Sequence, residues 1–134
     1  MLIVNTDKPK GIKVEGEYSR FIASFLSCHL QSEVHGFSVG MVILPPGGKS
    51  QPHSHETAQE IWYVLEGEAE FVIGEEKGRA KKGDIVYGPE KVTHTLFNLS
   101  ETKPFKALLI LCPGGDESNV TDTLLSGGGV FYED

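Results

Sequence analysis

The sequence predicts an all-β domain, either a sandwich or a barrel, from three features of its pattern. The 134 residues include 16 glycines and 7 prolines, which cluster between short apolar segments. Within those segments apolar and polar residues alternate, as in half-buried strands. No segment keeps a helical period. A chain of this length is expected to form a single domain that buries a core without help from disulfides.

The first two expected strands cover residues 21–30 and 37–44. In the first, Phe21, Ala23 and Phe25 recur at period two and His29 follows in the same phase. The second stops at the cluster Pro45-Pro-Gly-Gly48, because proline cannot continue a strand ladder.

Two apolar runs follow, at residues 61–65 and 69–73, and we expect both to be strands. Gly67 lies between them and indicates a tight bend or a hairpin. Residues 74–78 are expected to form a turn. Further strands are predicted over residues 84–87, 92–98 and 105–111, the last of them buried.

The last part of the chain has a different composition. It is polar and rich in glycine, with apolar islands at residues 124–125 and 130–132. We expect an extension that covers a strand edge or crosses to a neighbouring subunit, and a frayed terminus is the alternative. The predicted division is a barrel domain over residues 1–113 and an extension over residues 114–134.

The composition favours a small molecule as the partner. The net charge is −7 and the chain has only two arginines, which argues against nucleic acid and against an anionic membrane. No apolar run is long enough to span a membrane, and the start lacks a basic leader. Cys28 and Cys112 are far apart and fit two reduced thiols, although a single bridge stays open. We therefore expect a cytoplasmic protein.

Three histidines and a glutamate have the spacing of a metal site. On a strand His53 and His55 would point to one face, about 6 to 7 Å apart. A turn after them could fold the carboxylate of Glu60 over the same ion, and an antiparallel partner strand could bring His94 opposite. Such ligands suit a first-row divalent ion, and binding would weaken as pH falls through the imidazole pKa of roughly 6.5.

The alternative is that these histidines have no metal. A lone histidine such as His94 is more often a core or surface residue, and a His-x-His pair is a weak pattern by itself. His29 and His35 are expected to be a structural histidine and a loop residue.

Two longer motifs resemble those of the cupin superfamily. The first, G-x5-H-x-H-x3,4-E-x6-G, is filled by Gly47, His53, His55, Glu60 and Gly67. The second, G-x5-P-x-G-x2-H-x3-N, is met by Gly83, Pro89, His94 and Asn98. Only 15 residues separate the motifs. This short spacing resembles that of compact single-domain cupins. The resemblance covers residues 47–98.

The second motif departs from the family at one position. Lys91 stands where the family has glycine. If the turn needs a left-handed backbone, the lysine would cost about 1 to 2 kcal/mol, which a packed barrel can tolerate. A lysine that reaches toward an anionic substrate is the alternative to a solvated side chain.

The resemblance implies a double-stranded β-helix, which is a jelly-roll barrel, and commonly a homodimer. It also implies a divalent metal ion held by His53, His55, Glu60 and His94, with iron, manganese, nickel, cobalt, copper and zinc all acceptable. Period two then places further residues on the side of the ligands. We expect the substrate pocket to include Gln51, Trp62 and Leu96, with Val64, Val92 and Asn98 facing the same way. Trp62 could equally be a core residue.

The function that follows is a metal-dependent enzyme acting on a small oxygen-bearing organic molecule, as a dioxygenase, decarboxylase or sugar isomerase. The resemblance does not choose among these reactions, and no catalytic residue beyond the ligands can be named. A non-catalytic module that binds a small molecule or the metal itself is the alternative. A purely structural role, as in seed-storage cupins, is disfavoured because this chain keeps all four ligands.

Overall fold

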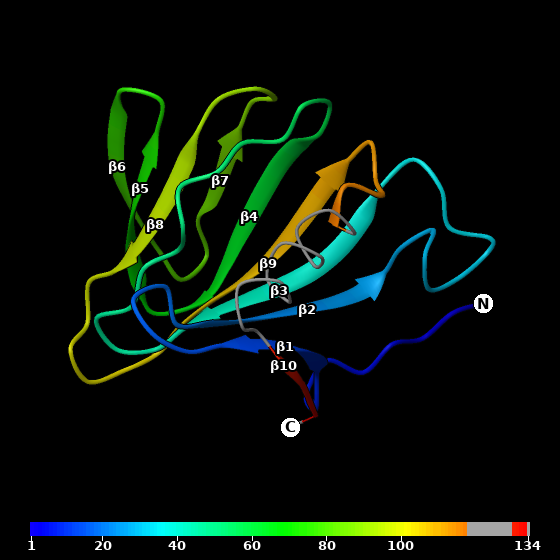
Figure 1. Cartoon of the computed structure of the whole chain (residues 1–134), viewed down its shortest axis with the longest axis horizontal. Helices are drawn as coiled ribbons and strands as arrows, with labels where there is room; N and C mark the ends of the chain where they lie inside the picture. Colours follow the sequence, from blue (N-terminus) through cyan, green and yellow to red (C-terminus); the bar gives the residue numbers. More distant parts are fainter. Residues whose placement is uncertain (118–129, 134) are drawn as a thin grey trace.

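The fold is built from ten strands, seen here in a computed structural model that describes residues 1–117 and 130–133 (Figure 1). The strands, in chain order, are β1 Lys10–Val14, β2 Arg20–Leu26, β3 Ser38–Leu44, β4 Gln59–Glu66, β5 Glu68–Ile73, β6 Glu76–Lys81, β7 Ile85–Gly88, β8 His94–Asn98, β9 Phe105–Cys112 and β10 Val130–Glu133. Every pair among them is antiparallel. The all-β prediction is confirmed.

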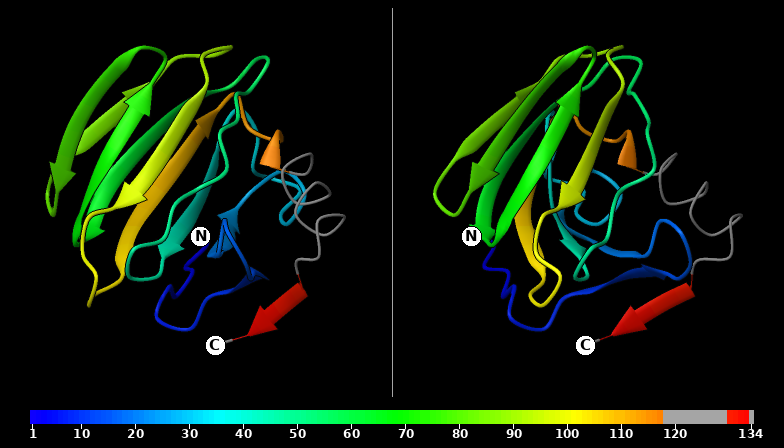
Figure 2. Two further views of the ribbon diagram at one scale, coloured as in Figure 1. Left: turned by 60° about the vertical axis from the view of Figure 1, so that its left-hand side comes forward. Right: turned by 90° about the vertical axis from the view of Figure 1, so that its left-hand side faces the viewer.

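The strands form two sheets that face each other (Figure 2). The larger sheet has the order β10-β1-β2-β3-β9-β4-β7, and the smaller has the order β6-β5-β8. Side chains from both sheets meet in one apolar core, which includes Val42, Leu44, Trp62, Val64, Phe71, Leu96, Phe105 and Ala107. The alternation of the strands places these residues inside, because successive side chains point to opposite faces.

The chain passes from the larger sheet to the smaller at Gly67. Its backbone has a φ of 83°, and a Cβ there would lie 2.9 Å from the carbonyl oxygen of Pro104. Only glycine accepts both conditions without strain. The residue therefore makes a tight bend between sheets, and of the two alternatives the hairpin is wrong, because β4 and β5 belong to different sheets.

Three strands were not predicted from the sequence. The expected turn over residues 74–78 is wrong beyond Glu75, because β6 begins at Glu76 and pairs with β5. Its sequence, EKGRAK, is charged and exposed except at Ala80, as an edge strand allows. The others, β1 and β10, pair with each other in the larger sheet, where β10 forms the edge farthest from β7 (Figure 1).

The pairing of β10 confirms that residues 130–133 of the tail cover a strand edge. The apolar island at residues 124–125 lies outside the described residues, and the division at residue 113 stays a prediction. Cys28 and Cys112 are both exposed free thiols. Among the described residues there is no helix with the length and apolarity needed to cross a membrane.

Candidate metal centre

His53 and His94 are brought together by a single antiparallel bridge. The amide of His94 donates to the carbonyl of His53 at 2.9 Å, and the reverse bond is 3.3 Å. The predicted strand around His53 is limited to this bridge, because the residues beside it are irregular. The expected alternation nevertheless holds. His55 is buried, whereas Ser54 and Glu56 are exposed.

The four predicted ligands converge. One ligand atom from each of His53, His55, Glu60 and His94 lies within 4.8 Å of the others. The Nε2 atoms of His53 and His94 are 3.1 Å apart. Oε1 of Glu60 lies 3.0 Å from Nε2 of His55 and 3.9 Å from Nε2 of His94. His55, Glu60 and His94 are buried and His53 is half-buried.

Outer contacts fix how two of the imidazole rings present their nitrogens. Nδ1 of His53 donates to the carbonyl oxygen of Gln51 at 2.8 Å. In the neutral ring Nε2 is therefore unprotonated, and its lone pair can bind a metal ion. Nδ1 of His55 contacts the carboxylate of Asp116. Such contacts commonly orient metal-binding histidines. The ring of His94 meets the edge of Trp62, with centroids 4.9 Å apart.

The environments separate the pKa values of the three histidines. Burial, followed by the charges of His53 and His55, lowers the pKa of His94 to about 3. Burial also lowers the pKa of His53. For His55 burial acts in the same direction, but the hydrogen bonds and charges of Glu60 and Asp116 outweigh it and raise the pKa. The fold therefore favours the neutral form of His53 and His94 and the protonated form of His55, whose proton competes with a metal ion.

This donor set fits a divalent first-row metal. Two ligand atoms, imidazole nitrogens or carboxylate oxygens, that bind one ion at about 2.1 Å and roughly at right angles lie about 3.0 Å apart. The spacings of 3.0 and 3.1 Å in the cluster match that value. Imidazole and carboxylate ligands accept several first-row metals, so the set does not select one. The structure thus has a His-His-Glu-His cluster that could bind a metal ion.

The cluster opens into a small cavity of about 60 Å³ between the sheets. Its apolar wall is formed by Ile22, Val42, Trp62, Leu96, Leu109 and Leu111, and its polar groups belong to Arg20, Ser50, His53, His55, Glu60, His94 and Glu117. Trp62 and Leu96 therefore lie where the sequence placed them. Trp62 is also a core residue, 1% exposed.

Two other residues that were expected to face the pocket, Gln51 and Asn98, do not line the cavity. Gln51 is exposed, and it contributes its backbone carbonyl to His53 rather than a side chain to the cavity. Asn98 is buried away from the cavity, and its Nδ2 donates to the carbonyls of Pro45 and Lys103 at 3.0 and 2.9 Å. His29 and His35 are both exposed and lie outside the strands.

Lys91 occupies a left-handed backbone conformation, with a φ of 63°. The left-handed backbone on which the expected cost of a lysine depends is therefore present. Its amide donates to the carbonyl of His55 at 2.7 Å, which ties the two motifs together beside the cluster. The side chain is exposed.

Sequence reasoning missed four polar residues near the cluster. Arg20, Ser50 and Glu117 line the cavity, and Asp116 contacts His55. The two acidic residues lie in the polar tail, where no pattern marks them. A signal existed for Arg20, because it precedes a period-two strand and stands two residues before the apolar Ile22.

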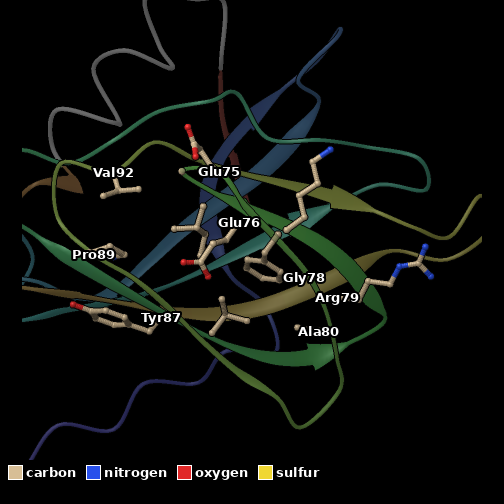
Figure 3. A pocket seen from close by; sticks show the side chains of 13 residues that line it. Glu75, Glu76, Gly78, Arg79, Ala80, Tyr87, Pro89 and Val92 are labelled. Atoms are coloured by element: carbon tan, nitrogen blue, oxygen red, sulfur yellow. The ribbon is translucent and has the colours of Figure 1, made fainter.

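A larger groove of about 750 Å³ lies apart from the cluster, between β5, β6 and β7 (Figure 3). It is lined by Phe71, Ile73, Gly74, Glu75, Glu76, Lys77, Gly78, Arg79, Ala80, Val86, Tyr87, Pro89 and Val92. None of the four clustered residues belongs to it. Its size alone does not make it the functional site, because convergent metal-binding groups mark the smaller cavity.

Known proteins with similar sequences share this region. The family model for the cupin domain matches residues 40–111. The uncharacterized protein MJ1618 of Methanocaldococcus jannaschii is 38% identical over 76 residues, which cover 57% of this chain and 60% of that protein. The putative germin-like protein 12-3 of Oryza sativa subsp. japonica is 32% identical over 120 residues, which cover 82% of this chain and 52% of that protein. The chain thus spans little more than half of these relatives.

Solved structures share the fold. A Thermotoga maritima protein described as a predicted oxalate decarboxylase has a TM-score of 0.71 and 21% identity, over 84% of this chain and 99% of that chain. KdgF from a Halomonas species has a TM-score of 0.63 and 21% identity, over 74% of this chain and 83% of that chain. The ten-stranded architecture is therefore a double-stranded β-helix, and with a family model that covers more than half of its length, this chain belongs to the cupin family.

Proposed function

We propose that this protein binds one divalent metal ion through His53, His55, Glu60 and His94 and acts as an enzyme on a small oxygen-bearing organic molecule. The observation that carries the proposal is the convergence of four ligand atoms, within 4.8 Å of one another, at the wall of a cavity. A cluster made only for stability has no need to open into a cavity.

The residues around the cavity would have different roles. His53, His55, Glu60 and His94 would hold the ion, and Asp116 and the carbonyl of Gln51 would orient two of the rings. Trp62, Leu96 and their apolar neighbours would exclude water and shape the space for a substrate. A bound divalent ion would supply Lewis acidity toward substrate oxygens or, as iron, redox chemistry with dioxygen.

Dioxygenase, decarboxylase and sugar isomerase are the reaction classes that we propose. Support for decarboxylation comes from the fold of the Thermotoga maritima protein described as a predicted oxalate decarboxylase, at 21% identity. That likeness concerns the fold, and the same fold carries many reactions.

A non-catalytic binding module is the second candidate. The same four ligand atoms could hold an ion, and the cavity of about 60 Å³ a small ligand, without any conversion of that ligand. We infer for either function a cytoplasmic location, which suits two exposed free thiols.

Turnover assays separate the two candidates. The iron-, manganese- and cobalt-loaded proteins would be assayed with a panel of small carboxylic acids and sugars, with and without oxygen. An enzyme should convert at least one compound, and His94→Ala should abolish that conversion. Loss of oxygen should abolish it only for an oxygenase. An absence of turnover with every metal and compound, together with tight binding of one of them, would favour the binding module.

A further inference from the structure

Arg20 is a buried cation in the cavity of the metal cluster. It is the first residue of β2, is only 6% exposed, and lines the cavity together with His53 and His94. Its position in the strand explains this orientation. Ile22, two residues on, lines the same cavity, and alternate residues of a strand face the same side.

The guanidinium of Arg20 has donors that the described residues leave unused. Its Nη1 donates to the carbonyl of Tyr18 at 3.0 Å, and no carboxylate of the described residues forms an ion pair with it. An arginine side chain has five N–H donors in a planar fork that matches a carboxylate. A buried charge is costly without a counterion. The arrangement therefore favours an anionic group in the cavity.

The two carboxylates that share the cavity already have partners. Glu60 belongs to the metal cluster. Glu117 accepts hydrogen bonds from the hydroxyls of Ser27 and Ser38 and from the amide of Gly115. Although burial alone would raise the pKa of Glu117, these hydrogen bonds lower it. Glu117 is thus held as a carboxylate by partners other than Arg20.

Arg20 also acts electrostatically on the cluster. Its positive charge is one of the smaller influences that lower the pKa of His53, after burial. Burial lowers the pKa of Arg20 itself, as expected for a charge that water reaches poorly, and the guanidinium still stays protonated. A ligand in this cavity therefore meets a fixed positive charge close to the metal-binding groups.

We propose that Arg20 binds the carboxylate of a small organic acid, whose second oxygen-bearing group lies against the cluster of His53, His55, Glu60 and His94. This inference rests on the proposed function, because it names the substrate class of the same site. The cavity of about 60 Å³ limits the acid to roughly two to four carbon atoms. Arg20 is in this account a residue that determines specificity.

The test compares two isosteric probes on the Mn²⁺-loaded protein. Glycolate and its neutral amide, glycolamide, would be titrated by calorimetry into the parent protein and into Arg20→Met and Arg20→Lys. Arg79→Met is the matched control, because it removes the other arginine of the chain, which lies on β6 outside the cavity. We expect glycolate to bind about 10- to 100-fold more weakly to Arg20→Met, with Arg20→Lys in between and Arg79→Met unchanged. Glycolamide affinity should change little.

Metal content separates this inference from the proposed function. Parent and Arg20→Met proteins should carry equal metal. If they do and glycolate binds both equally, the inference about Arg20 is overturned and the metal site stands. If the parent protein takes up no metal, the proposed function fails instead.

A measurement on the metal-free parent protein covers the case in which Arg20→Met does not fold. Glycolate should raise the melting temperature of that protein more than glycolamide does, because Arg20 remains when the metal is gone. Equal shifts from the two probes would overturn the inference.

Discussion

His94 and His55 respond to the same cluster in opposite ways. Burial and two neighbouring histidines lower the pKa of His94 to about 3, whereas the carboxylates of Glu60 and Asp116 raise that of His55. Below pH 6.5 the unfolded chain protonates His94 but the folded chain does not, so acidification removes stability. The raised pKa of His55 has the opposite sign: it stabilises below pH 6.5, and this contribution is lost as pH rises through the folded pKa.

The contribution of His94 can be isolated by substitution. We predict that the melting temperature of the metal-free parent protein falls relative to that of His94→Gln as pH is lowered from 7 to 4. The measurement is a thermal melt of both proteins across that range in the presence of a chelator. Parallel curves would show that His94 is not held neutral by the fold.

Lys91 is a strained residue at a position where the family has glycine. Its φ of 63° costs a non-glycine residue about 1 to 2 kcal/mol. We predict that Lys91→Gly raises the free energy of unfolding by about 0.5 to 1 kcal/mol, because the greater freedom of glycine in the unfolded chain offsets part of the gain. Denaturant titration measures this change. Lys91→Ala is the control, since it removes the side chain and keeps the strain, and an equal gain in that variant would contradict the explanation.

The four clustered residues and two of the residues around them, Trp62 and Leu96, could be predicted from the sequence, and the charged residues around them could not. The spacing along the sequence was enough to recognise the proposed ligands His53, His55, Glu60 and His94. This holds even though the strand expected around His53 is a single bridge. Arg20 and Asp116 are distant in sequence from the cluster and reach it only through the fold. Nothing local to Asp116 specifies that contact, and the strand period near Arg20 indicates the face of its side chain but not the cluster that it meets.

At the scale of elements, seven of the ten strands among the described residues were predicted from the sequence, and β1, β6 and β10 were not. The strands β4 and β5 bury alternate side chains and so show period two, whereas β3 and β9 are recognisable as mainly apolar runs. The strand β6 buries only Ala80 and so shows no such pattern. The strand β1 has only two buried apolar residues, Ile12 and Val14, with the charged Lys13 between them. The pairing of β10 with β1 depends on a contact between the two ends of the chain.

The strand β7 leaves room for Trp62 at Gly88. A Cβ on Gly88 would lie 2.8 Å from Cζ3 of the indole, which is 1% exposed and packs against His94. We predict that Gly88→Ala destabilises the protein by about 1 to 3 kcal/mol, because a rigid buried ring cannot move aside easily. It should also shift the fluorescence of Trp62, the only tryptophan of the chain.

Gly78 provides the matched control for this substitution. It lies in β6, and a Cβ there has nothing within 4 Å. Gly78→Ala should leave both the denaturation midpoint and the fluorescence close to those of the parent. If the two variants behaved alike, close packing of Trp62 against β7 would not be the cause.

At the scale of the whole molecule, the outer face of the larger sheet is apolar near β4 and β7. Tyr63 pairs directly with Ile85, and Ile61 with Tyr87, so all four side chains share one face. Ile85 is 69% exposed and Tyr87 is 54% exposed. Exposed apolar patches of this kind mark interfaces. The expected homodimer stays a prediction, and we propose this face as its interface, because an apolar surface can match a second copy of itself despite the net charge of −7.

Light scattering coupled to size exclusion tests the dimer. The parent protein should elute as a dimer, and Ile85→Lys should elute as a monomer, because the lysine would be buried without a partner in the interface. Leu30→Lys is the control, since Leu30 is 57% exposed and lies outside the strands. A monomeric parent, or a dimer that survives Ile85→Lys, would rule out this interface.

The most direct test of the central claim is the metal content of protein purified without a chelator or a nickel column. We predict close to one divalent metal ion per chain in the parent protein, and loss of that ion in both His53→Ala and His94→Ala. His35→Ala, which removes an exposed histidine outside the cluster, should keep the metal. No metal in the parent even after reconstitution, or equal metal in all four proteins, would contradict the assignment of His53, His55, Glu60 and His94 as a metal centre.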